Sequence, residues 1–137
     1  MFQYIFVDNN VRDPKGKVLT KGRMAAQISH VSVKATQYFL QEGSQAMRDY
    51  VTPPAVNGDE AASKHLQRFD MKTVICKTNK GVPLAKVQES LEKHGLKYVV
   101  WNERPEEFDV CLALEPMRDA DYPKEARAEL KKLTGLY

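Results

Sequence analysis

The chain begins with a strand that is apolar on both faces and continues, after a basic loop, into a long amphipathic helix. In Phe2 to Asp8, apolar side chains occupy both alternating sets of positions, which is typical of a central strand in an α/β sheet. From about Lys21 to about Glu42, apolar residues recur at steps of three and four, and Gly43 is suited to end the helix. The stripe consists of Met24, Ile28, Val31, Ala35 and Tyr38 or Phe39. A buried strand followed by such a helix favours an α/β fold.

The rest of the chain alternates between strand-like and helix-like segments. Further strands are expected at Met71 to Lys77, Leu96 to Trp101 and Phe108 to Leu114, and helices at Leu84 to Lys93 and from Pro123 onward. Between Ser44 and Asp70 the composition turns polar, and Pro53-Pro54 breaks the periodicity. Asp59 is placed to cap a short helix, so about residues 43–69 are interpreted as an insertion with one or two helices. We predict one α/β domain over residues 1–137, with a small mixed four-stranded sheet, helices on both faces and a helical insertion after the first helix.

Size and composition bound the class of protein. A chain of 137 residues can bury a core without metal or disulfide staples. Its net charge of +3 is small, so polyanion binding would depend on local clustering of cations. Cys76 and Cys111 lie in apolar runs without metal-ligand spacing and are interpreted as buried thiols. No apolar run approaches the roughly 20 residues that cross a bilayer, so we expect no membrane association and a cytoplasmic location, with the mitochondrion as the alternative.

Basic residues gather between the first strand and the long helix. Five of them stand against the single acid Asp13: Arg12, Lys15, Lys17, Lys21 and Arg23. A helix start also presents unpaired N–H groups and the positive end of its dipole, so this location suits a phosphate-bearing ligand. A solvated basic loop before a core helix is the alternative interpretation. Gly16 and Gly22 match neither Gly-rich nucleotide spacing, and we expect no cofactor and no metal.

The run Lys-Gly-Arg-Met-Ala-Ala-Gln-Ile-Ser-His at residues 21–30 resembles the signature of the type II peptidyl-tRNA hydrolases of archaea and eukaryotes. Several later segments fall in that family's order: Lys72 to Cys76, the helix Leu84 to Leu96, the two final strands and the closing Leu133 to Tyr137. The resemblance covers nearly the whole chain except about Gly43 to Phe69. Within the family, Leu91 through Leu114, and especially Trp101 to Glu106, is more similar to the divergent branch called peptidyl-tRNA hydrolase domain-containing proteins.

The resemblance implies hydrolysis of the ester that joins a peptide to the terminal adenosine of tRNA. Such a site needs a group that orients or deprotonates a water, a cation or N–H donor for the oxyanion, and further cations for the RNA backbone. The resemblance assigns the catalytic roles to Lys21 and Arg23, with Asn102 or Glu103 handling the water. The candidates for substrate binding are Lys15, Lys17, Gln27 and His30. The implied partner is peptidyl-tRNA or another RNA, and homodimer formation is left open.

Two departures from the family bear on turnover. Arg23 stands where a lysine is expected, and arginine neutralises an oxyanion or phosphate without being able to shed a proton. After the third strand, standard members carry an Asp-Ala-Gly stretch with a threonine close behind, whereas this chain reads Asn-Glu-Arg-Pro-Glu-Glu from Asn102 to Glu107. The amide of Asn102 can position a water but cannot accept its proton. Glu103 acts either as the base or as a solvated partner of Arg104, and the threonine has no counterpart.

Acidic residues dominate the segment from Asn102 to Asp121. Seven acids stand against Arg104 and Arg118, and these acids would repel tRNA if they flanked the site. Either they point away from the basic loop, or the ligand is not a large polyanion. Trp101 is interpreted as a core residue in preference to a base-stacking platform, and His30 without the resemblance as a helix histidine bonded to a neighbour.

Three hypotheses from different classes therefore stay open. The first is a peptidyl-tRNA esterase, which we favour on the resemblance. The second is a catalytically weakened relative that still binds RNA. The third is a protein-interaction module that uses the segment from Ser44 to Phe69.

Overall fold

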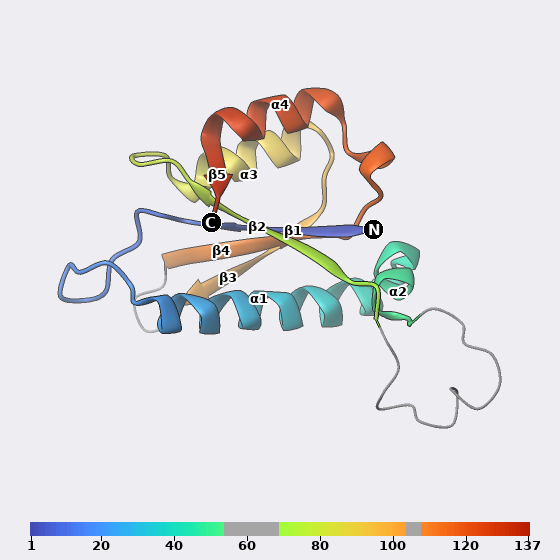
Figure 1. The fold of residues 1–137 in the computed structure, drawn as a ribbon, viewed down its shortest axis with the longest axis horizontal. Coiled ribbons are helices and arrows are strands. Elements are labelled where there is room, and N and C mark those ends of the chain that lie inside the picture. Colours follow the sequence, from blue (N-terminus) through green and yellow to red (C-terminus); the bar gives the residue numbers. More distant parts are fainter. Residues whose placement is uncertain (54–68, 104–107) are drawn as a thin grey trace.

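The protein folds around a five-stranded mixed sheet with the strand order β3-β4-β1-β2-β5 (Figure 1). The structure, a computed structural model, describes residues 1–53, 69–103 and 108–137. The strands are β1 (Phe2–Val7), β2 (Lys72–Thr78), β3 (Tyr98–Glu103), β4 (Phe108–Leu114) and β5 (Thr134–Leu136). β1 and β2 are parallel, and the pairs β1–β4, β3–β4 and β2–β5 are antiparallel.

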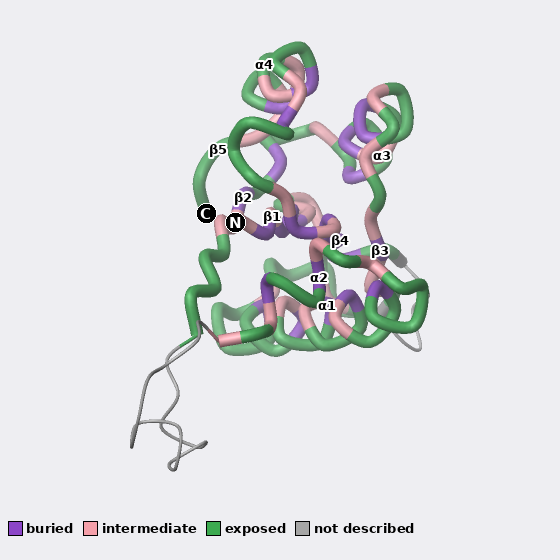
Figure 2. Tube along the Cα trace, turned by 90° about the vertical axis from the view of Figure 1, so that its right-hand side faces the viewer, coloured by how far each residue is buried: buried purple, intermediate pink, exposed green. Residues whose placement is uncertain are grey.

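Helices cover both faces of this sheet (Figure 2). α1 (Lys21–Gln41) and α2 (Gln45–Val51) lie on one face, and α3 (Leu84–Lys93) and α4 (Lys124–Leu133) lie on the other (Figures 1 and 2). A short 3-10 turn, η3 (Asp119–Asp121), precedes α4. The predicted α/β class with helices on both faces is confirmed.

The central strand β1 divides the core into two layers because its alternate side chains face opposite helices. Ile5 and Val7 belong to the cluster packed under α1, and Phe6 belongs to the cluster packed under α3 and α4. All three are at most 1% exposed. The apolar character of both faces of β1 in the sequence therefore follows from its central position in the sheet.

The sheet has five strands, so the prediction of four was wrong. β5 pairs with β2 over three residues only, and Leu136 in it is 76% exposed. A strand this short and this exposed carries no hydrophobic pattern that a sequence could reveal. β3 begins two residues later than predicted, because Leu96 is still part of the helix end. Its backbone N–H donates to the Leu91 carbonyl at 2.9 Å, next to Gly95 with a positive φ of 69°.

The first part of the predicted insertion packs into the core beneath the sheet. Ser44 caps α2 by accepting from the Met47 N–H at 3.0 Å, and Met47 is buried. The Tyr50 hydroxyl hydrogen-bonds Thr73 at 3.0 Å and the Lys72 carbonyl at 3.1 Å, which ties α2 to β2. The second predicted helix, starting at Asp59, lies outside the described residues.

Two further expectations concern cysteines and membranes. Cys76 and Cys111, both among the described residues, are buried and are not joined by a disulfide. In the ranges that the structure describes, no helix is long and apolar enough to cross a bilayer.

Candidate active site

The start of α1 is a positively charged helix end that no acidic side chain of the described residues neutralises. Thr20 is the N-cap, and its hydroxyl accepts from the Arg23 N–H at 3.2 Å. The first turn contains no acid, and Lys21 and Arg23 are both exposed. Within the described residues, neither side chain has a hydrogen-bond or ion-pair partner. Two cations thus add to the positive end of the helix dipole at a place open to a ligand.

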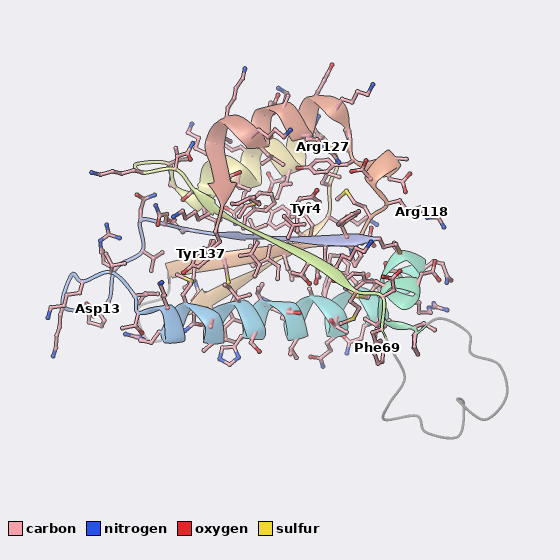
Figure 3. All side chains as sticks on the ribbon, viewed as in Figure 1. Tyr4, Asp13, Phe69, Arg118, Arg127 and Tyr137 are labelled. Carbon is pink, nitrogen blue, oxygen red and sulfur yellow. The ribbon has the colours of Figure 1, made fainter. Side chains whose placement is uncertain are left out.

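The loop between β1 and α1 presents two more cations at its tip. The Asp13 carboxylate accepts from the backbone N–H groups of Lys15 and Lys17, both at 2.9 Å, and Gly16 between them has a φ of 77°. The Asp13 carboxylate therefore stabilises the conformation of the loop, while the side chains of Lys15 and Lys17 are both exposed. The loop projects past the start of α1, and Figure 3 labels Asp13 near its tip.

Gln27 is fixed between α1 and the edge strand β3. It is 7% exposed, and its Oε1 accepts from the Trp101 indole N–H at 2.7 Å. An indole N–H can only donate, so the amide oxygen of Gln27 must face it and the amide NH2 faces elsewhere. His30 packs on the same indole with ring centroids 4.9 Å apart and a tilt of 35°. Trp101 is half-buried against the core under α1, as predicted, and its partners are two residues of the signature.

These contacts show that α1 and β3 run in opposite directions. Lys34 donates to the Val100 carbonyl at 2.6 Å, and Gln27, earlier in α1, contacts Trp101, later in β3. Continuing this trend brings the first turn of α1 to the end of β3. Figure 1 shows both at the same end of the molecule, beside the projecting loop.

A β-bulge shapes the end of β3. Trp101 pairs with Cys111 but Asn102 pairs with Asp109, which leaves Val110 as an extra residue in β4. The Val110 carbonyl is still hydrogen-bonded, because it accepts from the Asp8 N–H at the end of β1 at 2.9 Å. Val110 and Cys111 both belong to the core cluster under α1. The bulge therefore directs the side chain of the preceding residue, Asp109, away from the core under α1.

Asp109 is an acid beside Asn102 that the sequence did not single out. The Asn102 amide donates to Asp109 Oδ1 at 3.1 Å, and both residues are exposed. Asp109 also lines a groove of about 430 Å3 with residues from the β1–α1 loop, including Arg12, and from the segment before α3, including Pro83. The sequence gives only a weak indication that Asp109 belongs to a site, because a single acid inside the apolar run of β4 is typical of a strand position that faces solvent.

A second acid in the same groove has a structural role. Asp8 Oδ1 accepts from the Asn10 N–H at 2.7 Å, and its Oδ2 accepts from the Leu84 N–H at 3.1 Å, where α3 begins. Asn10 in turn exchanges side-chain hydrogen bonds with the Gly81 N–H and the Val82 carbonyl, each at 2.8 Å. Both oxygens of Asp8 are thus used to hold two loops together at the carboxyl ends of β1 and β2.

Comparison with known proteins places the chain in a family. A protein-family model described as Peptidyl-tRNA hydrolase PTH2 matches residues 1–131, nearly the whole chain. The chain belongs to this peptidyl-tRNA hydrolase family. No curated protein matched in a direct search of individual sequences. The match confirms the predicted family, while assignment to the divergent branch stays a prediction.

In this peptidyl-tRNA hydrolase family member, the predicted residues fall into three groups at one end of the sheet. Lys21 and Arg23 start α1, Lys15 and Lys17 mark the loop tip, and Gln27 and His30 pack against Trp101. Asn102 points to Asp109 and the groove before α3, not to the indole on the α1 side. The side chain of Glu103 lies outside the described residues, so its predicted role as base stays a prediction.

Two of the described acids of the acid-rich segment lie far from the basic start of α1. Asp119 and Asp121 form the 3-10 turn before α4, at the opposite end of the molecule from the β1–α1 loop (Figure 1). Arg118, next to that turn, is labelled far from Asp13 in Figure 3. Of the seven acids, Asp109 is the one whose described side chain lies in the groove with Arg12. Glu106 and Glu107 lie outside the described residues.

Proposed function

We propose that this chain hydrolyses the ester bond between the peptide and the tRNA of peptidyl-tRNA. The observation that carries the proposal is the acid-free start of α1, where exposed Lys21 and Arg23 stand without side-chain partners in the described part of the chain. Family membership supports the reaction class. A phosphate or a developing oxyanion is the kind of ligand that such a helix end attracts.

In this proposal, the cations of α1 stabilise the charge that develops during hydrolysis. Water attacks the ester carbonyl carbon, negative charge grows on the carbonyl oxygen, and the ribose oxygen leaves with a proton. Lys21 and Arg23 are both within the first turn, so one can neutralise the oxyanion while the other holds the terminal phosphate. Arginine at position 23 stays charged at any physiological pH, so its role is electrostatic and not acid–base.

Asp109 supplies the proton acceptor that Asn102 lacks. One oxygen of Asp109 is held by the Asn102 amide, and its other oxygen has no partner among the described residues. A carboxylate fixed in this way can orient a water and take its proton, with Asn102 as a positioning residue. Asp8, in the same groove, is excluded from this role because both of its oxygens bind backbone N–H groups.

The tRNA backbone would follow the loop cations. Arg12 lines the groove, and Lys15 and Lys17 extend from the tip, so a strip of positive charge leads from the groove past the start of α1. Exposed His30, packed on Trp101 about two helical turns after Arg23, offers an aromatic surface for a base. Each phosphate contact should contribute about one counterion to the salt dependence of binding.

The test is cleavage of N-blocked aminoacyl-tRNA by the purified protein, measured as free tRNA. We expect cleavage, and a loss of about a hundredfold in kcat for Arg23→Ala and for Asp109→Asn. Matched controls lie at the other end of the molecule: Arg118→Ala for the first variant and Asp121→Asn for the second. For Lys21→Ala the control is Lys124→Ala, because both lysines are exposed first residues of a helix.

The outcomes separate the open hypotheses. Cleavage that survives Arg23→Ala unchanged would refute the role of the α1 start. Salt-sensitive RNA binding without turnover, weakened by Lys21→Ala but not by Lys124→Ala, would favour the RNA-binding relative. Neither cleavage nor RNA affinity, together with protein partners that persist when the loop lysines are neutralised, would favour the interaction module.

A further inference from the structure

A second pocket lies on the face of the sheet that α1 does not cover. It has a volume of about 300 Å3 and is enclosed by β1 and β2 below, α4 above and β5 at the side. Figure 3 shows Tyr4 rising from the sheet toward Arg127 on α4 in this region. None of the residues assigned to ester hydrolysis lines it.

Aromatic rings form the floor and one wall of this pocket. The Tyr4 ring stacks with Phe6 at 6.3 Å between centroids and 16° between planes, and it meets Tyr122 edge-on at 5.1 Å and 68°. Val74 from β2 and Leu130 from α4 continue the apolar lining. A flat ring inserted here would contact ring faces and edges at the spacings that aromatic pairs prefer.

The polar groups of the pocket are hydrogen-bond donors and cations. The hydroxyls of Tyr4 and Tyr122 have no hydrogen-bond partner among the described residues. Burial raises the pKa of both phenols, so both keep their protons and can donate at neutral pH. Arg127 stacks over Tyr122 at 4.7 Å and pairs with Asp119. Lys131 is exposed at the rim without a partner in the described part of the chain, and none of the lining residues is an acid.

We propose that this pocket binds a small aromatic carboxylate, with the ring between the tyrosines and the carboxylate at Lys131 and Arg127. The volume is at the lower end of the range for ligand pockets, which limits the ligand to one or two rings. The charge favours an anion, because no lining residue is an acid and Lys131 is a cation without a partner among the described residues, whereas Arg127 is already paired with Asp119. The two phenol O–H groups add donors that an anionic oxygen can accept. This site is independent of the proposed ester hydrolysis.

The experiment uses 2-naphthoate as the probe and titrates it into the full chain while recording amide NMR spectra. We expect saturable binding, with the largest shift changes at the amides of Val74, Leu130 and Leu136. The neutral analogue 2-naphthylmethanol should bind several times more weakly. The amides of Arg23 and Gln27 should not move, which separates this pocket from the proposed active site.

The matched variants are Lys131→Glu and Lys132→Glu, which make the same charge change at adjacent positions of α4. Both lysines are exposed, but only Lys131 lines the pocket. Lys131→Glu should weaken 2-naphthoate binding by about fivefold, and Lys132→Glu should leave it within twofold. Tyr122→Phe, which keeps the ring and removes the hydroxyl, should weaken binding as well. The proposal is overturned if no binding saturates at millimolar 2-naphthoate, if the shifts gather at the start of α1, or if the two lysine variants behave alike.

Discussion

The hydrogen bond between Gln27 and Trp101 predicts a measurable coupling between a signature residue of α1 and the edge strand. Gln27→Met keeps the length of the side chain and removes the acceptor at 2.7 Å, so the half-buried indole N–H loses its partner. A buried donor left without an acceptor costs about 1 to 3 kcal/mol, and Trp101 is only half-buried. We therefore expect a loss of about 1.5 kcal/mol in the free energy of unfolding, or about 5 °C in Tm.

A double-mutant cycle isolates this interaction. Trp101→Phe removes the N–H donor, so Gln27→Met in that background should cost about 1 kcal/mol less than in the parent chain. The assay is urea unfolding followed by circular dichroism for the parent, both single variants and the double variant. The bond from the Cys111 thiol to Gln27 goes to the backbone carbonyl and is the same in all four proteins. Equal costs of Gln27→Met in both backgrounds would refute the coupling. A variant that keeps its stability and loses ester cleavage would assign Gln27 to the substrate instead.

Three further predictions concern stability. Gly95→Ala should lower the free energy of unfolding by about 1 kcal/mol because φ is 69° there, whereas Gly22→Ala in α1 should raise it by about 0.5 kcal/mol. A Cβ would meet open space at both positions, so the difference comes from the backbone alone. Urea unfolding compares the two variants, and equal effects would contradict this argument. Tyr50→Phe should cost about 1 kcal/mol by untying α2 from β2, and an unchanged urea midpoint would show that this tie is not needed. Glu129 on α4 has its pKa lowered from 4.5 to about 2, first by a hydrogen bond from Lys93. The stabilisation that Glu129 provides is therefore complete above pH 4.5 and is lost as the pH falls toward 2. The difference in urea midpoint between the parent and Glu129→Gln should shrink over that range, and a constant difference would contradict the assignment.

The sequence predicted most of the fold because its long elements carry strong periodic patterns. The helix from Lys21 ends one residue before its predicted end at Glu42, and the strand Phe108–Leu114 has the predicted bounds. Patterns of this kind report which faces are buried. β5 was missed because it has only three residues, none of them buried, and so carries no hydrophobic period. The start of β3 was predicted two residues too early because Leu96 takes part in the C-terminal cap of α3, and such a cap depends on backbone geometry.

The candidate site was only partly predictable, because strand pairing decides which side chains meet. The signature placed the cations at the helix start, and the structure has them there, exposed. The proximity of Asn102 to Asp109 depends on the register of β3 against β4, and that register shifts at one bulge. Nothing in the local sequence marks Val110 as the extra residue. The same holds for Asp8, because one of its two backbone partners, Leu84, comes from a distant part of the chain.

The bulge at Val110 also decides which side of β4 carries a charge. Side chains alternate along a regular strand, but at the bulge Val110 and Cys111 both belong to the core layer beneath α1. If β4 kept Val110 and ran without the bulge, alternation from Cys111 would turn the Asp109 carboxylate into that apolar layer, a position that an ionised group strongly disfavours. Two consecutive apolar side chains on one side of the strand thus keep the charge of Asp109 in water.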